Sequence, residues 1–200
     1  MRIPVWIPLV FCTTGFGALL YQVVWQRVLY STFGVNVEAV TTVVTAFLAG
    51  LGVGSLAGGR LARGTDHTIL LFCGLIEIAI GIFGVWSLTF FRWIGSLTLG
   101  LPAIPRGAVM ALVVMLPTTL MGATLPLLVA FLVRSTGNVG RTVGLLYFVN
   151  TAGSAFAAIA AVLLILGTLG ETRSAYLAAS MNFLVGAFIL AGPLRRLPRS

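Results

Sequence analysis

The sequence predicts an all-α integral membrane protein with six transmembrane helices. Three observations lead to this fold class: 59% of the 200 residues are apolar, only 8% are charged, and the apolar residues gather in six stretches separated by charges. A soluble domain carries about 25% charged residues, so the composition excludes that class. It also excludes a disordered chain and a nucleic-acid binder, although the formal net charge is +8.

Each of the six apolar stretches is long enough to cross a bilayer, which takes roughly 20 residues. The predicted spans are 4–26, 38–59, 68–91, 107–133, 142–167 and 172–192. Together they form a single transmembrane domain, divided into a first three-helix unit (1–100) and a second three-helix unit (101–200). The predicted partner of this apolar surface is the lipid bilayer, and the predicted location is the cell (inner or plasma) membrane.

Arginine residues set the predicted orientation. Short loops rich in arginine stay in the cytoplasm. One side of the predicted membrane holds eight arginines and the other holds the four at 27, 92, 106 and 173. Both termini are therefore expected to be cytoplasmic. Trp25, Trp86 and Trp93 fall towards the outer ends of their spans, where amphipathic rings favour the interface.

Similar patterns recur in the two halves of the chain. The pattern Thr-Thr-x-x-Gly-Ala-x-Leu begins at Thr13 and again at Thr118, 105 residues later. Glu77 and Asn182 have the same separation, and the second and fifth spans share a Phe-x4-Gly pattern at an offset of 101. Three crossings are an odd number, so a repeated unit would be inverted, as in many transporters. The alternative is six helices without symmetry.

The second and third spans contain the two most informative features of single helices. Gly50, Gly54 and Gly58 follow each other at four-residue spacing, which predicts a helix face that allows close contact with another helix. Glu77 lies at the middle of its span, where an ionised carboxylate is costly. It is either a counter-charge for a cation or a proton carrier, or a protonated group that hydrogen-bonds Asn150, Asn182 or a threonine and joins helices.

Two groups of polar residues are candidate sites. The mid-membrane group shares a depth near the bilayer centre and comprises Glu77, Asn150, Asn182, Thr14, Thr118 and Thr119. The outer group shares one end of the first span and comprises Gln22, Gln26 and Arg27. The outer group could bind an anionic or polar ligand, and interfacial anchoring is the alternative.

Catalytic and metal-binding chemistry are not predicted. His67 is the only histidine and Asp66 the only aspartate, so a metal-ligand cluster or a histidine-based nucleophile cannot be assembled. No cofactor is expected. Cys12 and Cys73 both fall inside predicted spans, where they are expected to act as small apolar residues.

Three stretches carry a family resemblance: TGFGALLYQVVWQR at 14–27, PTTLMGATLP at 117–126 and GLLYFVNTAG at 144–153. In this order they resemble the membrane portion of the transmembrane spermidine synthase-like proteins. That family joins a facilitator-like membrane part to a polyamine aminopropyltransferase domain. The resemblance implies a synthase-like domain or partner in the cytoplasm. One aspartate and three glutamates cannot supply the catalytic half, so we do not expect this chain to be an enzyme by itself.

Three functions remain open at this point. The preferred one is a non-catalytic membrane module that anchors or scaffolds a cytoplasmic enzyme or a membrane assembly. The second is a transporter of a polyamine or another small solute that uses Glu77. Because six helices are half of a facilitator, this function requires a homodimer or a second half. The third is an accessory subunit of a larger complex with other membrane subunits.

Overall fold

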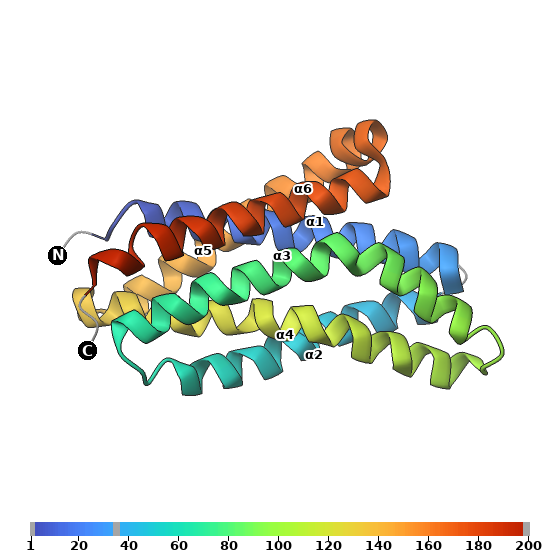
Figure 1. Cartoon of the computed structure of the whole chain (residues 1–200), viewed down its shortest axis with the longest axis horizontal. Helices are drawn as coiled ribbons and strands as arrows, with labels where there is room; N and C mark the ends of the chain where they lie inside the picture. Colours follow the sequence, from blue (N-terminus) through green and yellow to red (C-terminus); the bar gives the residue numbers. More distant parts are fainter. Residues whose placement is uncertain (1–2, 34–36, 198–200) are drawn as a thin grey trace.

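The computed structural model of the chain describes residues 3–33 and 37–197. The described residues form helices joined by short turns (Figure 1). The α-helices are α1 (Trp6–Phe33), α2 (Val37–Leu61), α3 (Asp66–Leu97), α4 (Ala103–Thr136), α5 (Val139–Ala160) and α6 (Leu166–Ala191). A π-helical segment, η1 (Ala161–Ile165), links α5 to α6, and a short 3-10 helix, η2 (Leu194–Arg196), follows α6.

The chain is a multi-pass helical membrane protein. Five continuous helical segments of the described chain are long and apolar enough to cross a bilayer, with mean hydropathies between 1.6 and 2.4. They are Trp6–Ser31, Thr41–Leu61, Asp66–Leu97, Ile104–Thr136 and Val139–Arg196. The first four contain most of the first four predicted spans. The fifth and sixth predicted spans fall together in the last segment, which is 58 residues long.

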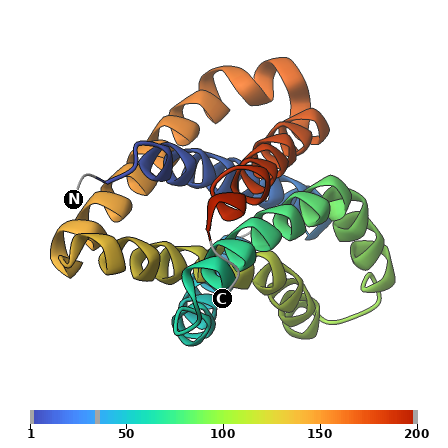
Figure 2. The same cartoon turned by 60° about the vertical axis from the view of Figure 1, so that its left-hand side comes forward.

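This long segment folds back on itself near its middle, so that α6 returns alongside α3 and α1 (Figures 1 and 2). Gly170 interrupts the helix there with φ 69° and ψ 179°. A residue with a Cβ is strained at such a φ, whereas glycine adopts it readily. The Ser174 hydroxyl donates a hydrogen bond to the Gly170 carbonyl at 2.6 Å and holds the first turn after the break.

The helices pack mainly in three pairs: α2 on α4, α1 on α5 and α3 on α6. Further contacts of α1 with α6 and of α3 with α4 join the pairs into one bundle (Figure 2). The beginning of α1 and the end of α6 lie at the same end of this bundle (Figure 1).

Close backbone contact holds α2 against α4, as the glycine spacing predicts. A Cβ placed on Gly54 would overlap the carbonyl oxygen of Thr119, and one on Gly58 would lie 2.5 Å from the carbonyl oxygen of Ala123. Gly50 lies against the side chain of Thr118 in the same way. Only residues without a side chain allow the two helices to approach this far.

One of the predicted interfacial tryptophans belongs to the core instead. Trp25 is 1% exposed, and its indole N–H donates to the Ser87 hydroxyl at 3.0 Å. Its ring stacks on Tyr21 and meets Phe91 edge to face. The prediction that Trp25 lies at the interface is therefore wrong, because partners on α3 satisfy both its apolar and its polar parts. Trp86 is 67% exposed and Trp93 is 55% exposed.

Candidate functional site

A cavity of about 300 Å³ lies inside the bundle, and all six α-helices contribute to its wall. This volume is at the lower end of the range for small-molecule sites. Its polar lining residues are Thr14, Gln22, Ser55, Glu77, Thr124, Tyr147, Asn150, Ser154 and Asn182. The apolar lining residues include Phe11, Leu19, Phe47, Leu51, Ile80, Met121 and Leu125. The cavity is therefore apolar with a limited set of polar groups, as ligand sites usually are.

The most buried polar contact of the cavity joins Glu77 on α3 to Asn182 on α6. The Asn182 side-chain Nδ2 donates to Glu77 Oε2 at 2.6 Å, and the two residues are 4% and 2% exposed. Asn182 is thus the partner of Glu77 among the three alternatives that the sequence left open. The other amide atom, Asn182 Oδ1, is buried without a hydrogen-bond partner. An unsatisfied buried acceptor is costly unless a ligand or water completes it.

Two further members of the predicted mid-membrane group line the cavity from α1 and α5. The Thr14 hydroxyl and the Asn150 side-chain amide both donate to the carbonyl oxygen of Phe11, at 3.0 Å and 3.2 Å. The structure therefore brings Thr14 and Asn150 together on a wall of the same cavity as Glu77 and Asn182.

The two threonines of α4 lie elsewhere. Thr118 is fully buried, donates to the Val114 carbonyl at 3.0 Å and packs against Gly50 of α2. Thr119 borders a separate hollow between α3 and α4 that Phe83 and Leu116 also line. Neither residue is among those that line the central cavity.

Four polar residues of the cavity were not singled out from the sequence: Ser55, Thr124, Tyr147 and Ser154. Ser55 and Ser154 each follow a glycine, Gly54 and Gly153, that packs closely on a neighbouring helix. The Gly-Ser pair present in both the second and the fifth predicted spans was therefore a signal that could have found them. We find no comparable signal for Thr124 or Tyr147.

The predicted outer group separates into different environments. Gln22 lines the central cavity, and Gln26 is half-buried outside its lining. Arg27 is exposed, and its Nε lies 3.8 Å from Glu171 Oε1. Arg92 of α3 approaches the other oxygen of Glu171, also at 3.8 Å. Ion pairs across α1, α3 and α6 thus occupy this end of the bundle.

No family model, curated protein or solved structure matches this chain. Its function has to be argued from the geometry of its own residues.

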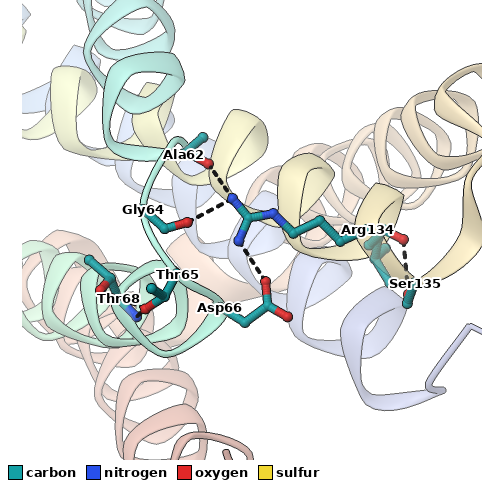
Figure 3. Close-up of polar contacts among 8 residues, drawn as sticks. Ala62, Gly64, Thr65, Asp66, Thr68, Arg134 and Ser135 are labelled. Atoms are coloured by element: carbon teal, nitrogen blue, oxygen red, sulfur yellow. Dashed lines mark hydrogen bonds and ion pairs between the residues drawn. The ribbon is translucent and has the colours of Figure 1, made fainter. Parts of the chain in front are cut away.

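A second charged cluster lies at the end of α4, by the turn between α2 and α3 (Figure 3). The Arg134 guanidinium donates to Asp66 Oδ1 at 2.8 Å and to the carbonyl oxygens of Ala62 and Gly64 at 3.0 Å and 2.7 Å. The Thr65 hydroxyl accepts a hydrogen bond from the Thr68 backbone N–H and caps α3. This cluster fixes the turn to α4.

Among the described residues, one acidic side chain lines the cavity, and two others form ion pairs outside it. Glu77 is the one carboxyl group among the described residues of the lining, and no arginine or histidine is among them. Asp66 and Glu171 are paired with arginines outside it. No group of three or more metal-ligating side chains occurs in 3–33 and 37–197. The cavity can bind and orient a solute, and Glu77 can hold or exchange a proton.

Proposed function

We propose that this protein is a membrane carrier that binds a small solute in the central cavity, beside Glu77 and Asn182. One observation carries the proposal: a carboxylic acid and an amide, both almost fully buried, meet in a cavity lined by every α-helix. Ionisable groups inside a membrane are costly, and they commonly mark substrate or proton pathways. Asn182 Oδ1 is buried without a hydrogen-bond partner, which leaves an unused acceptor beside Glu77.

The carrier would cross the membrane six times. Gly170 lies inside α6 and divides the last long segment into a leg that runs from Val139 to Leu169 and a leg that runs from Glu171 to Arg196. Each leg exceeds the roughly 20 residues that a bilayer requires. An even number of crossings agrees with the bundle, in which the beginning of α1 and the end of α6 lie at the same end (Figure 1). The excess of arginine assigns that end to the cytoplasm.

Side-specific labelling tests this orientation. In a chain whose Cys12 and Cys73 are replaced by alanine, Gly100→Cys places one thiol in the turn between α3 and α4, and Gly140→Cys places one thiol in the exposed first turn of α5. A membrane-impermeant maleimide should label position 100 from outside intact cells and position 140 only after the membrane is opened. The reverse pattern would place the termini outside.

The interhelical contacts support the inverted repeat of three helices. The Ser55 hydroxyl of α2 donates to the Gly122 carbonyl of α4 at 3.2 Å. The Ser154 hydroxyl of α5 donates to the Gly15 carbonyl of α1 at 3.0 Å. The two contacts correspond to each other: a serine of α2 bonds a glycine carbonyl of α4 in the first, and a serine of α5 bonds a glycine carbonyl of α1 in the second. In the repeat, α1 corresponds to α4 and α2 corresponds to α5.

The glycine contacts follow the same exchange. Gly54 packs on the Thr119 carbonyl, and Gly153 packs on the Cys12 carbonyl. In these glycine and serine contacts, the matching residues of α1 and α4 are 107 positions apart, and those of α2 and α5 are 99 positions apart. Each offset differs by two residues from the value in the sequence patterns, which was 105 for the first and fourth spans and 101 for the second and fifth. In the α3–α6 pair, Gly81 meets Phe183 and Gly186 meets Ile78, which preserves the offset of 105.

The resemblance to the spermidine synthase-like membrane portion favours a second function, the anchoring of a cytoplasmic synthase-like domain. One topology serves both functions, because it places the end of the last described helix on the cytoplasmic side. As a carrier, the six helices would correspond to half of a facilitator, and we propose a homodimer. The intact mass of the native complex in mild detergent tests the dimer. A cytoplasmic enzyme that co-purifies instead would favour the anchor.

A solute panel tests the carrier. The thermal stability of the purified chain is measured with small cations, neutral molecules and anions, and solutes that stabilise it are assayed for flux in proteoliposomes. We expect Glu77→Gln to abolish both effects. Glu171→Gln, which removes a carboxylate outside the cavity, should leave both intact. Absence of stabilisation and flux across every solute class would exclude a carrier.

A further inference from the structure

We propose that the solute is a small organic cation with a single primary ammonium head, bound between Glu77 and Asn182. This inference rests on the proposed carrier function and specifies the chemistry of its substrate. The polar lining supplies the argument, because its serine and threonine hydroxyls already donate their hydrogens to protein atoms, and because it contains a carboxyl group without an arginine.

The serine and threonine hydroxyl groups of the lining are used as donors within the protein. Each donates to a backbone carbonyl oxygen: Thr14 to Phe11 at 3.0 Å, Ser55 to Leu51 at 2.9 Å, Thr124 to Met121 at 2.7 Å and Ser154 to Gly15 at 3.0 Å. A hydroxyl has one hydrogen and two lone pairs. These four groups therefore have acceptor capacity left for a ligand and no donor.

The side-chain amides of the two asparagines also act as hydrogen-bond donors within the protein. Asn150 donates to the Phe11 carbonyl at 3.2 Å, and Asn182 donates to Glu77 at 2.6 Å. The buried Asn182 Oδ1 keeps an unused acceptor beside the carboxylate. An ammonium group offers three donors and accepts nothing, so it matches this set of oxygens.

Charge limits the head to one positive group. Glu77 is the one acidic side chain among the described residues of the lining, and no arginine lines the cavity. An anion would lie next to a carboxylate in a desolvated site, which is unfavourable. A second ammonium group inside the cavity would have no carboxylate to pair with. The structure therefore favours a monocation over a polycation.

The size and the walls of the cavity favour an organic cation over a metal ion. The volume of about 300 Å³ exceeds what a single inorganic ion occupies, and apolar side chains surround most of it. The rings of Phe11, Phe47 and Tyr147 line the wall. Aromatic rings attract ammonium groups, and they also cover an alkyl chain.

Calorimetric titration of the purified full chain in detergent tests the inference. The probes are n-butylammonium, n-butanol and n-butyrate, which share an alkyl chain and differ in the head group. Butyltrimethylammonium keeps the charge without N–H donors, and 1,4-diaminobutane carries two charges. We expect n-butylammonium to bind at least about tenfold more tightly than every other probe, since buried charged hydrogen bonds carry this discrimination.

Two variants connect this preference to the named residues. Glu77→Gln keeps the side-chain shape and should weaken n-butylammonium about tenfold or more, whereas the control Glu171→Gln should leave its affinity unchanged. Asn182→Ala should reduce the preference for n-butylammonium over butyltrimethylammonium. If Glu77→Gln fails to fold, as judged by its thermal unfolding, the comparison between these two cations in Asn182→Ala decides the question.

Several results would overturn the inference and leave the carrier intact. These are tighter binding of butanol or butyrate, tighter binding of the diamine, displacement of n-butylammonium by millimolar sodium, or an affinity that Glu77→Gln does not alter. The inference would also be overturned, and the carrier would stand, if none of the five probes binds while a solute of another chemical class in the panel does. Failure of the probes and of the whole panel would overturn the carrier as well.

Discussion

The α2–α4 pair and the α3–α6 pair are both close helix contacts, but different residues hold them. Glycines bring α2 against the backbone of α4, and Gly54 and Gly58 are in direct contact with carbonyl groups. The α3–α6 pair also uses glycines, yet it contains the buried contact between Glu77 and Asn182. The α2–α4 contact thus depends on close backbone packing, whereas the α3–α6 contact combines packing with a buried hydrogen bond between two polar side chains.

The charged clusters associated with these two pairs differ as well. Arg134 of α4 makes three hydrogen bonds of 2.7 to 3.0 Å to the α2–α3 turn and the start of α3 (Figure 3). Glu171 of α6 lies 3.8 Å from each of two arginines, beyond hydrogen-bond distance. We therefore expect the cluster at the α2–α3 turn to contribute more to stability than the cluster at Glu171.

The largest expected effect comes from Gly54→Leu. The added side chain would overlap the backbone of α4, and we expect a loss of about 3 kcal/mol or more in the free energy of unfolding. Gly52→Leu is the matched control, because Gly52 is exposed and has open space around its Cβ position. Thermal unfolding in detergent measures both variants. Equal stability would show that the α2–α4 contact does not depend on glycine.

Asn182→Leu should have the next largest effect. It removes the hydrogen-bond partner of Glu77 and leaves a buried carboxyl group unsatisfied, at a cost of about 1 to 3 kcal/mol. Glu77→Gln should be milder, because a glutamine side chain can still accept from the Asn182 amide. Chemical unfolding in mixed micelles compares the two. A Glu77→Gln variant less stable than Asn182→Leu would contradict the proposed order.

Arg134→Ala should cost about 1 kcal/mol, since the lost hydrogen bonds lie in a partly exposed cluster. The turn between α2 and α3 should also become more sensitive to protease, because Ala62 and Gly64 lose their contact with α4. Arg141→Ala serves as a control for the loss of an exposed arginine near the same end. If both variants behave alike, the cluster has no stabilising role.

The smallest expected effect is that of Arg27→Ala, at about 0.5 kcal/mol or less. Its ion pair with Glu171 is long and exposed, so solvent and salt screen it. A double-mutant cycle with Glu171→Gln at low and at high salt measures the coupling. Coupling above about 1 kcal/mol that persists in high salt would mean that this ion pair is stronger than the one at Arg134.

The positions of the apolar helices could be predicted from the sequence more fully than the rotation of each helix about its axis. The apolar lengths predicted the first four spans, and four members of the predicted mid-membrane group line one cavity, namely Thr14, Glu77, Asn150 and Asn182. The apolar lengths could not determine that Thr118 packs on α2 while Thr124 lines the cavity, because both lie in the same apolar helix. Which face of a helix meets which neighbour depends on packing against the other helices.

The ion pairs of Glu171 were missed for a related reason. Glu171 was treated as a boundary between two spans, and its partners Arg27 and Arg92 are distant in the sequence. The sequence came closer to predicting the hydrogen bond between Asn182 and Glu77. Asn182 was one of the partners suggested for Glu77, because the two residues share a depth.

The fold-back at Gly170 also has a consequence for membrane insertion. In the proposed topology of six crossings, the two legs on either side of it are joined without an extended loop, so only a short polar stretch containing Glu171 and Arg173 would have to be moved across the bilayer. Its backbone groups remain largely hydrogen-bonded within helices, which reduces the cost of their passage through hydrocarbon. In that topology each leg finds its main partner outside the fold-back, because α5 packs on α1 and α6 packs on α3 and α1.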